Sequence, residues 1–584
     1  MQHLAHSITS ALVCTALIGG VHARAIDQDT SAPVLVELMA DELEYSMQHL
    51  VNDDGTRPYY LAYAITDVTS HSIVAQLGAL YSDDTSHRRM LDVDIRVGDY
   101  ELDNTHKIRG GGAGFARGFG GGDAVSVEDN SDAIRHALWQ ATDRQFKTAV
   151  ERHQQVVTNL KTMVAEESKA NDFSREEPSV HSEDDVALDL GHLAWAQRIR
   201  TVSEMATQHP LVYSSRVSLS ATAENRYMVS SEGTRLKTGR ELLRVTLSAS
   251  TKAADGTDLS QTHIFNAATE DGLPTEDQMR AAFSRVINMV LALREAPIVE
   301  PYTGPAILMN RASGVFFHEI FGHRIEGHRQ KDVDEGQTFT KMVGQPVLPE
   351  FMSVSDDPTQ ARFSGEDLRG FYRYDDEGVP ASRVELVKDG VLKTFLLSRS
   401  PVPGFNRSNG HGRREPGNAV VSRQGNLIVH SDQTVTFQRL REMLIEECRN
   451  QDKPYGFLFE DITGGFTTTG RGGPQASKVL PVAAYRIYAD GRPDELVRGV
   501  DIVGTPLSCF SQITCTGDDP AVFNGSCGAE SGWVPVSAIS PSILVRQIEI
   551  EKRQRSQERL PILPSPIATN DQANRAAPAA GNQE

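Results

Sequence analysis

The residues with the clearest chemical potential form one short segment, His318-Glu319-Ile320-Phe321-Gly322-His323. Neutral imidazole nitrogens bind zinc, and a carboxylate beside them can take a proton from a zinc-bound water. On a regular helix, side chains five positions apart point about 140° away from each other, so His318 and His323 cannot share a metal on a straight helix. We therefore expect the helix to distort or end here, which Gly322 permits because glycine tolerates unusual backbone conformations. The alternative is a surface helix that carries two histidines and no metal.

A third metal ligand must come from elsewhere, and the candidates are His328, Glu326 and a distant cysteine. His328 repeats the five-residue step, which turns it away on a regular helix. Cys527 lies among glycines in FNGSCGAESG, where a thiolate can approach a metal, although a buried and inert thiol is also common. Two histidines with Cys527 would leave a fourth position open, as in catalytic zinc sites.

Two further groups could assist such a centre. Glu326 follows His323 by three residues and could accept a hydrogen bond that orients a ligand histidine, or it could be a solvated surface glutamate. The segment NGHGRRE places His411, Arg413 and Arg414 beside glycine. These side chains could bind carboxylate or carbonyl groups of a substrate, or lie in a solvated loop.

Other motifs that carry chemistry are absent. The glycine-rich stretch RGGGAGFARGFGGGD at 109–123 has neither the GK[ST] of a P-loop nor the G-x-G-x-x-G spacing, so it is not a phosphate cradle. We interpret it as a mobile loop that borders a binding channel, with a simple connector as the alternative. No GxSxG is present, which removes the most recognisable signal of a serine hydrolase.

Composition and the first residues narrow the class of protein. The 584 residues carry a formal net charge of -20, which argues against a general nucleic-acid binder. An apolar run from Ile8 to Val21, followed by Ala23-Arg24-Ala25, predicts a signal peptide over 1–25 and export to the periplasm or the exterior. The alternatives are a mis-chosen start or a membrane anchor, but the run is short for spanning a bilayer, which takes about 20 residues. No other stretch is long and apolar enough to be a membrane helix, so no stable membrane insertion is expected. Cys509 and Cys515 are close enough in sequence to form a disulfide in an oxidising compartment, or they stay free.

Periodicity predicts an N-terminal part with both helices and strands. Helical spacing of apolar residues marks three segments, 33–50, 132–167 and 275–294. Alternating patterns rich in β-formers mark five strands, at 58–68, 72–82, 89–98, 216–231 and about 241–251. A proline-bearing stretch at 296–306 then marks a boundary.

The second half has mainly strand patterns. Asp389-Gly390 and Asp490-Gly491 each separate two strand-like runs and predict hairpins. Helices are expected at the metal motif and near 439–449. The fold class is therefore α+β, with a metal-binding helix at the junction of two regions. We divide the chain into a signal peptide at 1–25, an N-terminal α+β region at 26–296 that could form one or two subdomains, a mainly β C-terminal domain at 297–552 and a disordered tail at 553–584.

Three blocks in this order resemble the TldD/PmbA family of metallopeptidases. They are HEIFGHRIEG at 318–327, YDDEGVPASRVELVKDGVLKTFL at 374–396, and SCGAESGWVPVSAISPSIL at 526–544, the last preceded by RGVDIVGTPL. The resemblance covers about Ile26 to Ile550. It implies a peptidase that holds one zinc ion per chain and acts on unfolded or leader-type peptides.

Carried onto this chain, the resemblance implies His318, His323 and Cys527 as metal ligands and Glu319 as general base. The family also includes silent subunits without HExxxH that pair with active ones, and this chain keeps all four residues of the active type. Similar members enclose the site in a dimer, so we expect a homodimer or a heterodimer with a related subunit. The signal peptide, the long N-terminal helix and the proline-rich tail depart from better-known members.

The sequence therefore predicts a zinc-dependent peptidase that hydrolyses unfolded or extended peptides, with Glu319 as the base for a zinc-bound water. Two alternatives stay open. One is a non-catalytic subunit that binds peptides or a partner, and the other is a zinc amidohydrolase that acts on small conjugates.

Overall fold

A computed structural model describes residues 35–108, 122–162, 170–332, 335–467, 469–470, 477–504 and 509–552, with a few positions between 560 and 567. The predicted signal peptide at 1–25, residues 109–121 of the glycine-rich stretch and most of the predicted tail lie outside the described residues. The fold is α+β, as predicted. No helix of the described chain is both long and apolar enough to cross a membrane.

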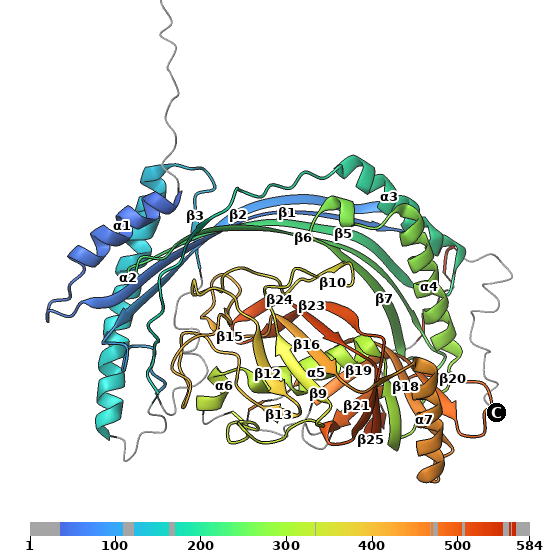
Figure 1. Ribbon diagram of the computed structural model, residues 1–584. Coiled ribbons are helices and arrows are strands. Elements are labelled where there is room, and N and C mark those ends of the chain that lie inside the picture. Colours follow the sequence, from blue (N-terminus) through green and yellow to red (C-terminus); the bar gives the residue numbers. More distant parts are fainter. Residues whose placement is uncertain are drawn as a thin grey trace, which may run out of the picture.

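One seven-stranded sheet forms the N-terminal part and curves as an arch over the rest of the molecule (Figure 1). Its strands follow the order β3-β2-β1-β5-β6-β4, with β7 paired to β6. The bounds are β1 Pro58–Gln76, β2 Ala79–Val97, β3 Asp123–Val125, β4 Val180–Ser182, β5 Ser214–Ser230, β6 Arg235–Lys252 and β7 Asp258–Ala267.

The prediction of three strands between 58 and 98 was wrong, because two long strands occupy this region. Strands β1 and β2 pair along their whole length and turn at Leu77 and Gly78, whose φ angles are 50° and 81°. A two-residue hairpin turn with both φ angles positive matches the twist of the strands. Because the turn uses Leu-Gly instead of Asn-Gly or Asp-Gly, the segment 72–82 had the pattern of one uninterrupted strand. Strand β7 was not predicted.

Four helices pack against this arch near its two ends (Figure 1). Helices α1 and α2 share one hydrophobic core with β1 and β2, and α3 and α4 share a second core with β5 and β6. Helix α4 begins where its sequence caps it, because Thr275 accepts from Gln278 N at 3.3 Å while the Gln278 side chain accepts from Thr275 N at 2.8 Å. The bounds are α1 Leu35–His49, α2 Ser131–Thr162, α3 His192–Glu204 and α4 Glu276–Glu295, with 3₁₀ turns at Met205–Gln208 and Glu270–Gly272.

Two larger sheets and two small strand pairs form the C-terminal part beneath the concave face of the arch (Figure 1). The six-stranded sheet has the order β13-β12-β9-β16-β24-β23, and the eight-stranded sheet has β17-β22-β25-β21-β19-β18-β8 with β20 on β19. The bounds of the first sheet are β9 Met352–Asp356, β12 Val384–Lys388, β13 Val391–Leu392, β16 Asn426–Ser431, β23 Ala521–Ala529 and β24 Gly532–Ser540. Those of the second are β8 Tyr302–Leu308, β17 Thr434–Val435, β18 Tyr455–Thr467, β19 Ser477–Tyr488, β20 Glu495–Val497, β21 Val500–Gly504, β22 Ile513–Gly517 and β25 Ile543–Lys552. The small pairs are β10 Arg362–Phe363 with β11 Glu366–Asp367, and β14 Gly412–Arg413 with β15 Val421–Ser422.

Both predicted Asp-Gly hairpins are present. Asp389 and Gly390 connect β12 to β13, and Asp490 and Gly491 lie in the loop that joins the antiparallel strands β19 and β20. Helix α7, Phe437–Asn450, matches the helix predicted near 439–449.

Helix α5, Asn310–Ile320, packs against strands of both C-terminal sheets and carries the metal motif. Its apolar residues enter a cluster of aromatic rings, in which Phe317 stacks on Phe510 with ring centroids 5.4 Å apart. Gly314 lets the helix approach β24 closely, because a Cβ atom there would lie 3.1 Å from the carbonyl oxygen of Ala538. Helix α5 is therefore held between the two C-terminal sheets over the residues that precede His318.

Cys509 and Cys515 are not joined by a disulfide in the structure. The two side chains lie in different hydrophobic cores, because Cys509 packs with the aromatic cluster around α5 while Cys515 packs with Leu440 and Cys448 of α7. The two cysteines are close in sequence but apart in space, because strand β22 begins between them. Cys515 lies on this strand and packs against α7.

Replacement of Phe317, which has no exposed surface, by alanine should lower the free energy of unfolding by about 3–5 kcal/mol. The exposed Phe466, 53 % accessible, offers a matched control whose replacement by alanine should change stability by no more than about 0.5 kcal/mol. Urea unfolding of the full chain, followed by circular dichroism, measures both. Wild-type stability in Phe317→Ala would contradict the buried position of α5.

Candidate metal centre

The two histidines meet because α5 ends between them. The helix stops at Ile320, Phe321 has φ -103° and ψ -56°, and a 3₁₀ turn runs over Gly322–Ile325. The imidazole rings of His318 and His323 then lie with centroids 5.0 Å apart and planes at 78°. The expected helix break is therefore present, and it converts a spacing unsuitable for a straight helix into a convergent pair.

Gly322 serves this turn through close approach and not through an unusual φ angle. A Cβ atom at this position would lie 1.9 Å from Oε1 of Gln424. The same Gln424 side chain donates through Nε2 to the carbonyl oxygen of His318 at 3.4 Å. Any larger residue at 322 would displace Gln424 and disturb the last turn of α5.

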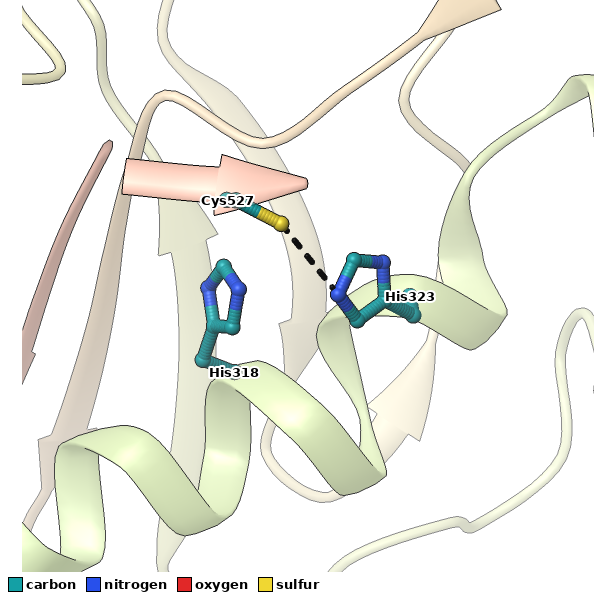
Figure 2. A group of neighbouring side chains, drawn as sticks. All are labelled: His318, His323 and Cys527. Atoms are coloured by element: carbon teal, nitrogen blue, oxygen red, sulfur yellow. Dashed lines mark hydrogen bonds between the residues drawn. The ribbon is translucent and has the colours of Figure 1, made fainter. Parts of the chain in front are cut away.

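Cys527 on β23 completes the group (Figure 2). Its Sγ lies 3.3 Å from Nε2 of His323, and the candidate ligand atoms of His318, His323 and Cys527 all lie within 4.8 Å of one another. All three side chains are buried. Burial alone would raise the pKa of the Cys527 thiol, but His323 and His318 lower it well below its ordinary value, which favours the metal-binding thiolate.

This donor set fits a zinc ion. One sulfur and two imidazole nitrogens suit zinc, whereas magnesium and calcium prefer oxygen ligands. Three protein ligands leave a fourth tetrahedral position open, as catalytic zinc sites require.

Glu319 lies beside these three residues. Its Oε2 is 3.9 Å from Nε2 of His323, and the side chain is 10 % exposed. Burial raises the pKa of Glu319 above its ordinary value. A carboxylate with a raised pKa at this position is a stronger base, which suits a group that accepts a proton and passes it on.

Glu326 contacts the other nitrogen of His323. Its two oxygens lie 3.2 and 3.3 Å from Nδ1 of that ring, which leaves Nε2 directed toward Cys527. Burial alone would raise the pKa of Glu326, but His323 and Arg329 lower it to about 2, so the group is a carboxylate. Such a contact fixes the tautomer and orientation of a ligand histidine.

Two arginines hold Glu326 in turn. Arg329 donates through Nε to Oε2 at 2.9 Å, and Nε of the fully buried Arg423 lies 3.5 Å from Oε1. Arg423 also donates to the carbonyl oxygen of Cys527 at 2.7 Å. It thus joins the turn that carries His323 to the strand that carries the thiol.

These ion pairs around Glu326 were not predicted from the sequence. The three-residue spacing of Glu326 and Arg329 is a readable local signal for an ion pair. Nothing in the sequence near Arg423 indicates its role, because its contacts are long-range. Glu530 was also missed, and it pairs with Arg329 at 2.9 Å and with His328. His328, a candidate third ligand from the sequence, is therefore engaged by Glu530 and stands outside the group of three.

The structure separates the three residues that the sequence singled out for substrate binding. His411 is fully buried, with Nε2 3.2 Å from Asp356 and Nδ1 near the oxygens of Asn409. Arg413 and Arg414 instead line a cavity beneath the N-terminal sheet.

The C-terminal half of this chain matches a known domain family. Residues 301–552 match the model of the PmbA/TldA metallopeptidase C-terminal domain. A protein of Archaeoglobus fulgidus named a metalloprotease is 31% identical over 242 residues, which are 41% of this chain and 51% of that protein. The match to this relative thus spans about half of its length.

Two further relatives carry the name TldD homolog. A metalloprotease TldD homolog of Buchnera aphidicola (subsp. Schizaphis graminum) is 24% identical over 480 residues, which are 78% of this chain and 88% of that protein. A zinc metalloprotease TldD homolog of Saccharolobus solfataricus is 25% identical over 277 residues, 45% of this chain and 57% of that protein.

A solved structure supports the same fold. TldE from Thermococcus kodakarensis superposes with a TM-score of 0.59 at 14% identity, over 88% of this chain and all of that one. The solved structure shows a shared fold. The matched C-terminal domain and the TldD homolog that matches across 78% of the chain support one conclusion: the chain belongs to the TldD/PmbA family.

Proposed function

We propose that this chain is a zinc-dependent peptidase that hydrolyses unfolded or extended peptides. The observation that supports this most is the convergence of His318, His323 and Cys527, with the carboxylate of Glu319 beside them. The metalloprotease names of its relatives support a hydrolase role of the same kind.

In this proposal His318, His323 and Cys527 hold the ion, and Glu319 moves the proton. When bound, zinc would polarise the peptide carbonyl and lower the pKa of a water molecule. Glu319 accepts a proton from the attacking water and passes it to the leaving amine. Its raised pKa suits both steps, because burial makes the carboxylate a stronger base than an exposed one. Glu326 keeps the His323 ring in the tautomer that presents Nε2.

The preference for extended peptides rests on the strand that carries the thiol. Among the described strands, β23 is the last in its sheet and pairs only with β24. A peptide in extended conformation can add to such an edge through main-chain hydrogen bonds. The ligand side chains are 5 to 7 % exposed, so a folded substrate could not bring its backbone to them.

Replacement of Glu319 by glutamine should leave zinc bound and reduce hydrolysis by about 10²–10⁴-fold, because the general base is lost while the ligands stay. Glu350→Gln makes the same chemical change at an exposed position and should retain full activity. Hydrolysis of an unfolded peptide and zinc content, measured on the same preparations, test this. Full activity in Glu319→Gln would rule out its role as base.

Replacement of Glu326 by glutamine should weaken zinc affinity by about 10–100-fold, because a carboxylate partner orients the ligand histidine and raises its basicity. Glu335→Gln is a matched control, since Glu335 also pairs with Arg329, at 3.1 Å, but makes no contact with His323. Competition with a chromogenic chelator gives both affinities. Equal losses in the two variants would mean that Glu326 acts only through general stability.

A further inference from the structure

A cavity of about 180 Å³ lies between the concave face of the N-terminal arch and the β23–β24 hairpin. We call it the arginine cavity, because five arginines line it. They are Arg88, Arg226 and Arg240 from the arch, and Arg413 and Arg414 from the C-terminal part. Such a concentration is unexpected in a chain with a net charge of -20.

Carboxylates neutralise only some of these guanidinium groups. Glu224 pairs with Arg240 at 2.8 Å, and Asp376 pairs with Arg226. Arg414 reaches Asp92, with 3.3 Å between Nη2 and Oδ2. Each of these three carboxylates therefore neutralises one cavity arginine.

The other lining carboxylates are occupied by main-chain groups. Asp375 accepts from the N–H groups of Glu377, Val379 and Gly412 at 2.9 to 3.0 Å. Glu415 accepts from the N–H of Trp533 at 3.0 Å. Neither forms an ion pair with a cavity arginine within the described part of the chain.

Arg88 and Arg413 form no ion pair with these acids; Arg88 is exposed, whereas Arg413 is buried. Arg413 is 4 % exposed, and its only close partners among the described residues are the carbonyl oxygen of Gln424, at 2.6 Å, and the ring of Tyr372, 4.7 Å from the guanidinium carbon. Burial and the nearby Arg240 and Arg423 lower the pKa of Arg413 to about 10. No carboxylate forms an ion pair with Arg413 in the described part of the chain, although the negative charges of Asp356 and Glu224 act on it from farther away. A buried cation without a directly paired anion is unfavourable unless an anion joins it.

Unused donors point the same way. Nε of Arg240 and Nε of Arg414 are buried and have no hydrogen-bond acceptor in the described structure. Buried N–H groups of folded proteins nearly always find a partner, either in the protein or in something it binds. A carboxylate can accept from two guanidinium N–H groups at once.

The cavity adjoins the metal centre through the strand that carries Cys527. Ser526 lines the cavity, and side chains alternate along a strand, so Cys527 faces the metal centre while Ser526 faces the arginines. A peptide added beside β23 alternates in the same way. Substrate side chains on the face of Ser526 would therefore point toward the arginine cavity while the backbone lies at the metal centre.

Trp533 gives this side of the hairpin an exposed apolar surface. Its side chain also lines the cavity and is 64 % exposed. The ring lies against Gly528, where a Cβ atom would be 3.0 Å from three ring atoms. The indole ring of Trp533 is thus held in place next to the cavity and can pack against the aliphatic part of a bound side chain.

We propose that the arginine cavity is a subsite for a carboxylate group of the peptide substrate, so that the enzyme prefers peptides with an acidic group close to the scissile bond. This inference rests on the proposed peptidase function. The carboxylate can come from an Asp or Glu side chain or from the C-terminus of the peptide, and both would be bound by the same guanidinium donors.

Binding to zinc-loaded Glu319→Gln protein tests the inference without turnover. Fluorescent peptides of one neutral sequence carry a single Glu or Gln at each position in turn, with a free or an amidated C-terminus, and fluorescence anisotropy gives Kd. A carboxylate at the favoured position should tighten binding by about tenfold or more over its neutral counterpart. A Glu effect with an amidated end assigns the side chain, and an effect of the free end alone assigns the terminus.

Second-site variants connect the effect to the cavity. Arg413→Gln and Arg240→Gln, each added to Glu319→Gln, should remove the advantage of the acidic peptide and leave the affinity for the neutral peptide within about twofold. Arg492→Gln, an exposed arginine outside the cavity, should keep the advantage. Arg240→Gln keeps the test valid if the buried Arg413 variant does not fold, as checked by circular dichroism.

The inference is overturned if no position shows a carboxylate advantage, or if the advantage survives in folded Arg240→Gln and Arg413→Gln. Hydrolysis by the wild-type chain, measured in parallel, separates the two proposals. Cleavage without acidic preference overturns only the subsite. Carboxylate-dependent binding without cleavage supports the subsite and counts against the peptidase.

Discussion

The metal centre depends on the ion pairs that surround one buried carboxylate, that of Glu326. The Glu326 side chain is fully buried, so its negative charge needs positively charged partners. Removal of one partner from a buried charge lowers the free energy of unfolding. His323, Arg329 and Arg423 surround it, and Arg423 extends to the carbonyl oxygen of Cys527. These ion pairs offset the cost of burying the Glu326 charge. They therefore also set the distance between the imidazole of His323 and the thiol of Cys527, which lie 204 residues apart in sequence.

The arch and the C-terminal part meet through charged groups in a similar way. Beneath the arch, Arg226 pairs with Asp376 and Arg414 with Asp92, so each pair joins one residue from the arch to one from the C-terminal part. Ion pairs fix orientation more than they add stability. These ion pairs position the arch over β23. Because the contact is made by charged groups and not by tightly packed apolar side chains, a polar cavity stays open beside the edge of β23. The acidic net charge of the chain hides this local excess of arginine.

Local chemistry made much of the fold and of the centre predictable. The helix break at Gly322 followed from the five-residue spacing of the histidines, and the place of α4 followed from the helical spacing of apolar residues over 275–294. The β1–β2 hairpin was missed because its turn uses Leu77 and Gly78, which lack the usual signal. Arg423 and the arginine cavity were missed for another reason. Their partners come from segments far apart in sequence, and no spacing rule reports a long-range ion pair.

X-ray absorption at the zinc edge tests most directly whether these residues form a catalytic-type metal site. On the purified full chain, we predict one sulfur at about 2.3 Å and nitrogen ligands at about 2.0–2.1 Å. The sulfur signal should vanish in Cys527→Ser. Zinc bound without any sulfur ligand, or wild-type protein that takes up no zinc, would contradict the centre built by His318, His323 and Cys527.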